Sequence, residues 1–224
     1  MSMAGRAMDQ PARTPHTDRA ERPPRADARA NRSRILQVAE EVFGKGGESA
    51  STEEVARLAG VGHATVFRHF PTKAALLEAV FVRRLERLRD QAGVLADAAD
   101  PGRAFFDFFA HTVADAASKI AIADALADEG AKAAASTVQA SDDLRWAVGV
   151  LLQRAQEAGA VRDDIDLPEL YALLIGTSRA AAYAHLDEKV RDRTLAIVFD
   201  GLAPRATKPY DGAAAGSHRE PPPT

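Results

Sequence analysis

The sequence predicts an all-α protein, in which an N-terminal three-helix domain with a helix-turn-helix precedes a larger helical domain. Apolar residues recur every three or four positions in most segments between residues 35 and 203, as they do on one face of a helix. Glycines interrupt this spacing at 44–47, 60–62 and 159, where helices are expected to end. No segment alternates apolar and polar residues for long enough to indicate a strand.

The first predicted domain, residues 28–75, contains three helices. The first has an apolar face that consists of Ile35, Leu36, Ala39, Val42 and Phe43. Ser51 and Glu54 have the spacing of a capping box, in which each side chain bonds the other residue's backbone N–H group, and they open the second helix. The third covers residues 63–70. Thr72 is then placed to cap a long helix that leads into the second domain.

The second predicted domain, residues 76–204, is rich in alanine and contains further helices. We expect them at about 101–117, 119–130, 141–158, 167–185 and 188–203, with residues 131–140 ambiguous between helix and loop. The two ends of the chain, residues 1–27 and 205–224, are polar and proline-rich and show no apolar periodicity. This composition predicts disordered tails.

The composition excludes several classes of protein. The chain has no cysteine, so it has no disulfide framework and no thiol nucleophile, and this fits a reducing cytoplasm. No apolar run approaches the ~20 residues of a membrane span. The Arg- and Pro-rich N-terminus lacks the apolar core of a signal peptide. We therefore expect a cytoplasmic protein that does not bind membranes.

Charge is distributed unevenly along the chain. Residues 1–90 contain 16 Lys and Arg against 12 Asp and Glu, a net charge of +4, whereas residues 91–224 contain 13 against 20, a net charge of −7. The basic front half indicates where a polyanionic partner would bind. Eight of the arginines lie within residues 1–34, however, so a basic disordered tail explains the asymmetry equally well.

The short helix at residues 63–70 is the most informative segment. It is enclosed by a glycine-containing turn at 60–62 and by Pro71, and two short helices joined in this way are typical of a helix-turn-helix. Val61, Val66 and Phe70 suffice to anchor its inner side. The alternative is a tight corner between two helices of an enzyme, which the turn alone does not exclude.

The outer side of this helix carries residues that suit a DNA groove. Arg68 can pair with guanine or phosphate, and Thr65 and His69 can form hydrogen bonds with base edges or phosphates. Ala64 is small enough to permit close approach to a base. The outward set is completed by His63 and Phe67.

Residues 29–77 closely resemble the DNA-binding domain of the TetR (tetracycline repressor) family of bacterial regulators. The family's motif helix commonly reads Ser-x-x-Thr-Leu-Tyr-x-His-Phe-x-x-Lys, and residues 62–73 of this chain read GHATVFRHFPTK. Four positions match, which are Thr65, His69, Phe70 and Lys73. Gly62 replaces the usual cap serine. Phe67 replaces a tyrosine whose hydroxyl commonly contacts a phosphate. Without the hydroxyl, Phe67 can offer only van der Waals contact.

The resemblance implies that the helix-turn-helix binds double-stranded DNA at a palindromic operator. Lys73 follows the cap of the long helix, where free N–H groups and a partial positive charge favour a phosphate, so it is expected to act as a phosphate clamp rather than an ordinary surface lysine. The residues expected to contact DNA are Thr52, Gly62, His63, Ala64, Thr65, Phe67, Arg68, His69 and Lys73.

No catalytic, cofactor or metal site is indicated. The chain contains no H-E-x-x-H, P-loop or G-x-G-x-x-G motif, and its serines and histidines lack a nucleophile–base spacing. Asp163, Asp164 and Asp166 precede a helix start, where we expect a solvated turn and a cap. His111 and His185 are isolated in the sequence.

The segment FFDFFAHTV, residues 105–113, predicts either a fully buried helix or the wall of a pocket. Its apolar positions cover much of the helix circumference, and ligand pockets are largely apolar and aromatic. The resemblance implies such a pocket, for a hydrophobic or aromatic effector. The residues expected to line it are Phe105, Phe109, His111, Thr112, Trp146 and Tyr171.

The last two helices carry small residues at helical spacing beside larger apolar ones. In the resembling family these helices pair with their copies in a four-helix dimer interface, and a helix-turn-helix that binds a palindrome requires two-fold symmetry. The alternative is packing inside one chain. The residues expected at the interface are Leu170, Leu174, Ala180, Ala184, Val198 and Leu202.

These features predict a homodimeric, sequence-specific transcriptional regulator without a cofactor, a repressor that a small molecule releases from its operator. The alternative is an α-helical enzyme or small-molecule-binding protein with an incidental helix-turn-helix. A regulator that activates transcription is a third possibility.

Overall fold

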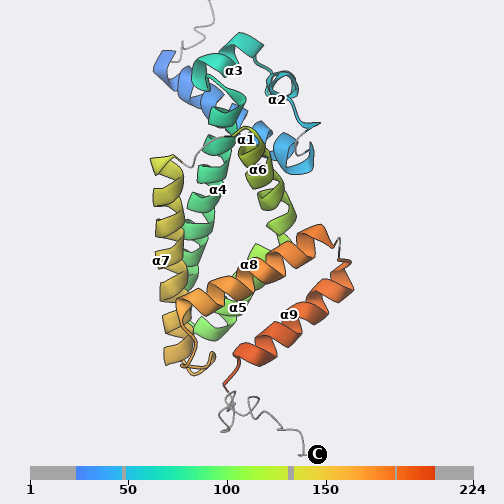
Figure 1. The fold of residues 1–224 in the computed structure, drawn as a ribbon. Coiled ribbons are helices and arrows are strands. Elements are labelled where there is room, and N and C mark those ends of the chain that lie inside the picture. Colours follow the sequence, from blue (N-terminus) through green and yellow to red (C-terminus); the bar gives the residue numbers. More distant parts are fainter. Residues whose placement is uncertain (1–23, 47–48, 131–133, 185, 205–224) are drawn as a thin grey trace, which may run out of the picture.

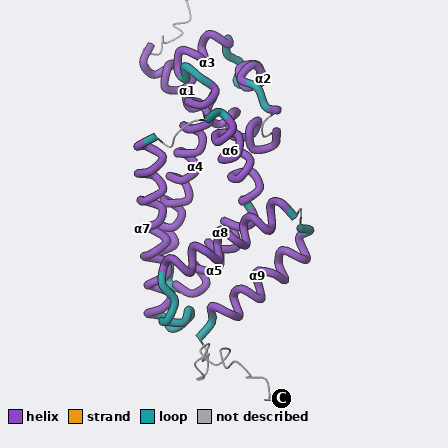
Figure 2. The backbone as a smooth tube through the Cα atoms, in the orientation of Figure 1, coloured by secondary structure: helices purple, strands orange, loops and turns teal. Residues whose placement is uncertain are grey.

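The computed structural model describes residues 24–46, 49–130, 134–184 and 186–204, and these residues form helices, turns and loops without a strand (Figure 2). The all-α prediction is confirmed. The helices of the described ranges are α1 (Pro24–Gly46), α2 (Thr52–Leu58), α3 (His63–His69), α4 (Lys73–Ala96), α5 (Pro101–Ala114), α6 (Ala116–Asp128), α7 (Ala135–Glu157), α8 (Leu167–Tyr183) and α9 (Glu188–Leu202). Residues 24–27, which the sequence assigned to a disordered tail, form the first turn of α1 instead. The rest of the predicted tails, residues 1–23 and 205–224, lies outside the described residues.

Two apolar clusters divide the described residues. The N-terminal cluster is built around α1, α2, α3 and the start of α4, and consists of Ile35, Leu36, Ala39, Val42, Phe43, Ala50, Val55, Ala56, Ala59, Val66, Phe70, Leu76, Leu77, Val80, Ile122 and Ala125. The C-terminal cluster is centred on Leu88, Phe105, Phe108, Phe109, Leu144, Val148, Leu151, Leu152, Leu170, Leu174, Leu195 and Leu202. Burying one such large side chain contributes roughly 1.5–3 kcal/mol. The two clusters stabilise the two ends of the molecule, and Phe81 packs against both of them.

Two helices connect these ends. The long helix α4 runs from α3 toward the C-terminal cluster and packs along α7 (Figure 1). The helix α6 packs against α1, α4 and α8, and its Ile122 and Ala125 belong to the N-terminal cluster. Although the sequence assigned all of residues 76–204 to the second domain, α6 thus supplies part of the core beneath the helix-turn-helix.

Local polar contacts define most helix ends. The Ser51 hydroxyl accepts a hydrogen bond from the Glu54 N–H (3.2 Å), and the Thr72 hydroxyl accepts one from the Ala75 N–H (3.0 Å). The N–H of Asp166 donates to the Glu169 carboxylate (3.0 Å) at the start of α8. Each such cap contributes about 1 kcal/mol.

A buried arginine joins three helices near the boundary of the two clusters. Arg84 of α4 is 4% exposed; its guanidinium donates to Glu40 of α1 (3.1 Å), to the Ser118 hydroxyl of α6 (3.1 Å) and to the Asp115 carbonyl (3.0 Å), and it pairs with the Asp115 carboxylate. Burial alone would raise the pKa of Glu40, but hydrogen bonds and charge from Arg87 and the charge of Arg84 outweigh it and lower that pKa. The network ties the first helix to α4 and to the start of α6.

Candidate nucleic-acid interface and internal cavity

A Schellman turn fixes the angle between α2 and α3. The Gly60 N–H donates to the Arg57 carbonyl (3.3 Å), and the Val61 N–H donates to the Ala56 carbonyl (3.1 Å). Gly60 has φ of +64°, a conformation that residues with a Cβ atom rarely adopt. Val66 and Phe70 then anchor α3 in the N-terminal cluster. The turn and two anchors therefore hold this short helix with its opposite side outward, at one end of the molecule (Figure 1).

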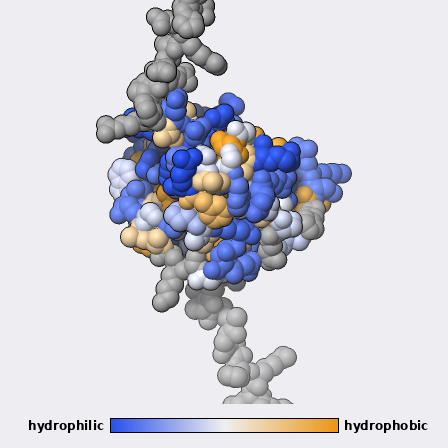
Figure 3. Space-filling model, turned by 90° about the horizontal axis from the view of Figure 1, so that it is seen from above, coloured by the Kyte–Doolittle hydropathy of each residue, from blue (hydrophilic) through white to orange (hydrophobic). Residues whose placement is uncertain are grey.

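The outward side of α3 carries most of the residues that the sequence predicted to contact DNA. His63, Ala64, Phe67 and Arg68 are exposed, and Thr65 and His69 are partly exposed. The Arg68 guanidinium donates to the Thr65 hydroxyl (2.9 Å). Much of the surface at this end of the molecule is hydrophilic (Figure 3). α3 thus presents hydrogen-bonding groups to the outside. Arg68 and Thr65 could replace the hydrogen bond between them with hydrogen bonds to base edges or phosphates.

Two further predicted residues have structural roles at the junction of α2 and α3. Thr52 is 8% exposed, and its hydroxyl lies 3.4 Å from His63 Nε2. The same imidazole nitrogen lies 3.1 Å from the Glu53 carboxylate, a partner that the sequence analysis missed. Gly62 caps α3 without a side-chain hydrogen bond. The first turn of α2 therefore orients His63 at the start of α3.

Lys73, the expected phosphate clamp, begins α4 beside the end of α6. Its ammonium lies 3.3 Å from the carboxylate of Glu129, the C-terminal cap of α6. This pair could not be predicted, because the two residues are distant along the chain. A phosphate that approached Lys73 would compete with Glu129 for the ammonium group.

Replacing Lys73 with alanine should weaken binding to all DNA sequences alike. We expect the slope of log affinity against log salt concentration to fall by about one for each phosphate contact removed. Replacing Glu129 with glutamine should act oppositely and raise DNA affinity, because Lys73 loses a competing anion. Filter binding across a salt series measures both, with Lys189→Ala and Asp163→Asn as matched surface controls. An unchanged salt slope in Lys73→Ala would contradict the phosphate contact.

A cavity of about 250 Å³ lies among α4, α5, α6, α7 and α8. Its wall is mostly apolar, with polar groups contributed mainly by α8 and singly by α5 and α6. The apolar lining consists of Phe81, Leu88, Phe108, Ile120, Ala123, Leu144, Val148, Leu174 and Ile175, and the polar lining consists of Thr112, Lys119, Tyr171, Ser178 and Arg179.

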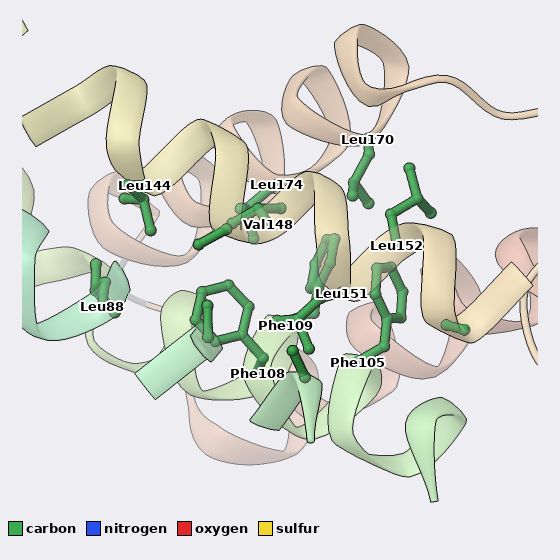
Figure 4. Packing of buried hydrophobic residues seen from close by; sticks show 14 of the residues in the cluster. Leu88, Phe105, Phe108, Phe109, Leu144, Val148, Leu151, Leu152, Leu170 and Leu174 are labelled. Atoms are coloured by element: carbon green, nitrogen blue, oxygen red, sulfur yellow. The ribbon is translucent and has the colours of Figure 1, made fainter. Parts of the chain in front are cut away.

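Only part of the ligand site predicted from the sequence lies at this cavity. Thr112 and Tyr171 line it, and the Thr112 hydroxyl donates to the Phe108 carbonyl (2.9 Å). Phe105 and Phe109 are each 2% exposed and belong to the C-terminal cluster without lining the cavity. In Figure 4 they project from α5 toward α7 together with Phe108. Phe108 and Thr112, about one turn apart on the same side of α5, line the cavity, whereas the ring of Phe109 contacts Phe199 of α9.

The remaining two predicted ligand residues lie at the surface. His111 is exposed, and Trp146 of α7 is 74% exposed beside Arg89 and Val94 of α4. The sequence analysis also missed Lys119, Ser178 and Arg179. A detectable signal existed for Lys119, which is the one charged residue in the stretch 116–123, AASKIAIA.

Burial perturbs two ionisable groups of the cavity wall, Lys119 and Tyr171. Burial lowers the pKa of Lys119 and the charge of Arg84 acts in the same direction, whereas Asp115 opposes them. Burial raises the pKa of Tyr171 to about 12, against a smaller opposing influence of Arg145. The Tyr171 hydroxyl therefore remains a hydrogen-bond donor at neutral pH, although it has no partner among the described residues.

The residues expected at the dimer interface fall into two groups. Leu170, Leu174 and Leu202 are at most 7% exposed and belong to the C-terminal cluster, against which Val198 also packs. Ala180 and Ala184 are exposed on α8. Large exposed apolar side chains accompany them on α8 and α9, namely Leu173, Ile175, Tyr183, Val190 and Ile197.

Neither a metal site nor a membrane span is present in the part of the chain that the structure describes. No group of three or more His, Asp or Glu residues there could hold a metal ion. No helix of the described residues is long and apolar enough to cross a membrane. Asp164 pairs with Arg162 ahead of α8, and His185 lies outside the described residues.

Comparison with known proteins agrees with this architecture. Residues 35–80 match the bacterial regulatory proteins of the tetR family, and residues 100–204 match the C-terminal domain of SbtR-like transcriptional regulators. The HTH-type transcriptional regulator UidR of Escherichia coli K12 is 31% identical over 90 residues. That match covers 39% of this chain and 43% of UidR, so the chain spans less than half the length of the curated relatives that it matches.

Solved structures extend the similarity to nearly whole proteins. A TetR transcription regulatory protein from Mycobacterium vanbaalenii is 38% identical, with a TM-score of 0.67, and the match covers 81% of this chain and 99% of that one. A TetR transcriptional regulator from Streptomyces coelicolor is 31% identical, with a TM-score of 0.65, and the match covers 78% and 99%. The chain is therefore a member of the TetR family of DNA-binding transcriptional regulators, which are not enzymes.

Proposed function

We propose that this regulator binds a palindromic operator as a homodimer through α3, and that a small molecule in the cavity releases it. The main support is the double role of α6. Lys119, Ile120 and Ala123 line the cavity, whereas Ile122 and Ala125 of the same helix belong to the N-terminal cluster. A ligand that displaces α6 would therefore repack the core on which α3 stands.

Contacts at both ends of α6 support this coupling. At its start, Asp115 and Ser118 bond to Arg84, and Gly44 of α1 approaches so closely that an added Cβ atom would lie 2.3 Å from the Ser118 hydroxyl. After its last turn, Glu129 pairs with Lys73. A shift of α6 would thus be transmitted to α1, against which α3 packs, and to the start of α4, which follows α3 in the chain.

The energetics follow from linkage. A ligand changes the balance between two conformations only by its difference in affinity for them. A tenfold preference for the conformation that does not fit DNA corresponds to about 1.4 kcal/mol of coupling. Repression is the simplest outcome of operator occupancy. Such a regulator would act in the bacterial cytoplasm, where the DNA is.

The proposed dimer would use the exposed apolar side of α8 and α9. Exposed apolar patches of this kind mark interaction surfaces, and two-fold symmetry is what a palindrome requires. The buried leucines 170, 174 and 202 would support this surface from within the chain, whereas Ala180 and Ala184 would contribute small residues where helices cross.

Substitution of Ala180 or Ala184 by arginine should break the dimer, because a buried unpaired charge costs several kcal/mol. Sedimentation velocity at micromolar concentration measures the change, and operator binding should fall with it. Ala158→Arg, at an exposed helix end, is the matched control and should remain dimeric. A wild-type monomer at this concentration would rule out the dimer.

The proposal as a whole is tested in two steps. Selection of bound DNA from random duplexes should yield a palindrome, whose half-sites report the two α3 helices. Metabolites and antibiotics are then screened for release of the protein from that operator, and transcription in vitro distinguishes repression from activation. If no compound releases the protein, ligand control is wrong and a constitutive regulator remains.

A further inference from the structure

The wall of the cavity carries positive charge only. Lys119 and Arg179 line it, and the described lining contains no Asp or Glu. This contrasts with the C-terminal part of the chain as a whole, where residues 91–224 hold 20 acidic against 13 basic residues. A cavity that excludes carboxylates in an acidic domain is electrostatically suited to an anion.

Lys119 in particular has no ion-pair partner among the described residues, and only the nearby charge of Asp115 favours its ammonium form. The carboxylate of Asp115, one turn earlier on α6, is bonded to Arg84, and no described carboxylate forms an ion pair with Lys119. Burial already disfavours the charged ammonium and lowers its pKa. An anion bound beside Lys119 would compensate for the hydration that the ammonium group loses on burial.

Tyr171 provides a second unsatisfied group on the opposite helix. Its hydroxyl is buried without a hydrogen-bond partner among the described residues, and the Arg145 guanidinium lies 4.9 Å from the centre of its ring. A protonated phenol is a donor that a carboxylate oxygen accepts well. The wall thus offers an ammonium group from α6 and a hydroxyl from α8.

The rest of the wall would reject a fully polar ligand. Phenylalanine, leucine, isoleucine and valine side chains from α4, α5, α6, α7 and α8 form most of it, and the volume of about 250 Å³ admits only a small molecule. We propose that the cavity binds a small amphipathic monocarboxylate, whose carboxylate contacts Lys119 and Tyr171 and whose apolar body fills the remainder. This inference rests on the proposed function of the cavity as the effector site.

Isothermal titration calorimetry with matched acids and amides tests the charge requirement. Butyrate to decanoate and phenylacetate are compared with their primary amides, which have the same shape without the charge. We expect at least one acid to bind about tenfold more tightly than its amide. Lys119→Met should remove this preference, Tyr171→Phe should reduce it, and Lys189→Met should leave it unchanged. Lys119→Gln repeats the test should the methionine variant fold poorly, as judged by circular dichroism.

Three results would overturn the inference. The acids and amides could bind equally, the acids could bind Lys119→Met as they bind the wild type, or no member of the series could bind. Operator release, measured in parallel, separates this inference from the proposed function. Acids that bind through Lys119 but leave operator affinity unchanged would support the inference and refute release by the cavity. If neutral compounds release the protein from the operator while acids do not, release through the cavity would be supported and the carboxylate inference refuted.

Discussion

Replacing Phe109 with alanine is expected to lower the free energy of unfolding by roughly 3–5 kcal/mol. The side chain is 2% exposed, and its ring meets the ring of Phe199 edge-on at 5.5 Å between centroids. Truncation would leave a void that the surrounding helices can fill only in part. Urea denaturation should show a lower midpoint, with a slope that is nearly unchanged.

Phe67→Ala provides the matched control for this substitution. The same atoms are removed, but from a side chain that is 37% exposed on α3. Its stability should remain close to that of the wild type while DNA affinity falls. If Phe109→Ala were as stable as the wild type, the packing of α5 described above would be wrong. Because Phe109 does not line the cavity, any loss of effector response in this variant would report a loosened core.

Replacing Arg84 with methionine should destabilise the protein by roughly 1.5–3 kcal/mol, because Glu40 and Asp115 lose charge-assisted hydrogen bonds from a buried partner. Glu40 keeps its pair with Arg87, which limits the loss. Arg89→Met is the control, since Arg89 forms an exposed pair with Asp90. Such pairs contribute at most about 1 kcal/mol. Equal unfolding free energies for the two variants would contradict a structural role for the network.

The same network should make stability depend on pH. The pKa of Glu40 lies below its ordinary value in the folded protein, so the folded state favours the ionised carboxylate. Its contribution is fully present above the unfolded pKa of about 4.3 and is lost as pH falls through the lower folded value. Unfolding measured between neutral pH and strongly acid pH should therefore show a smaller acid dependence in Glu40→Gln than in the wild type.

Features that depend on neighbouring residues could be predicted from the sequence. The caps at Ser51 and Thr72, and the helix end at Gly60, require only a few consecutive residues, and the structure contains all three. The sequence left residues 131–140 ambiguous between helix and loop and placed a helix from Ser141 onward, and in the structure α7 already begins at Ala135. Ser141 instead donates to the Thr137 carbonyl within the helix (2.8 Å).

Features that depend on the rotation of one helix against another could not be predicted. The aromatic run of α5 covers so much of the helix that its sequence does not reveal whether Phe108 or Phe109 faces the cavity. A stripe of leucines such as Leu170 and Leu174 can equally face the chain's own core or a partner. The pairs Lys73–Glu129 and Arg84–Glu40 join distant segments, and only the folded chain brings them together.

The central claim is that α3 recognises a specific DNA sequence through Thr65 and Arg68. The most direct measurement is the affinity of the Thr65→Ala/Arg68→Ala double mutant for the selected operator, with Arg154→Ala on α7 as the control. Each lost base contact should cost roughly 1–3 kcal/mol and relax the preference at one position of each half-site, while circular dichroism remains unchanged. A double mutant that binds the operator with wild-type affinity and wild-type sequence preference would contradict the assignment of α3 as the recognition helix.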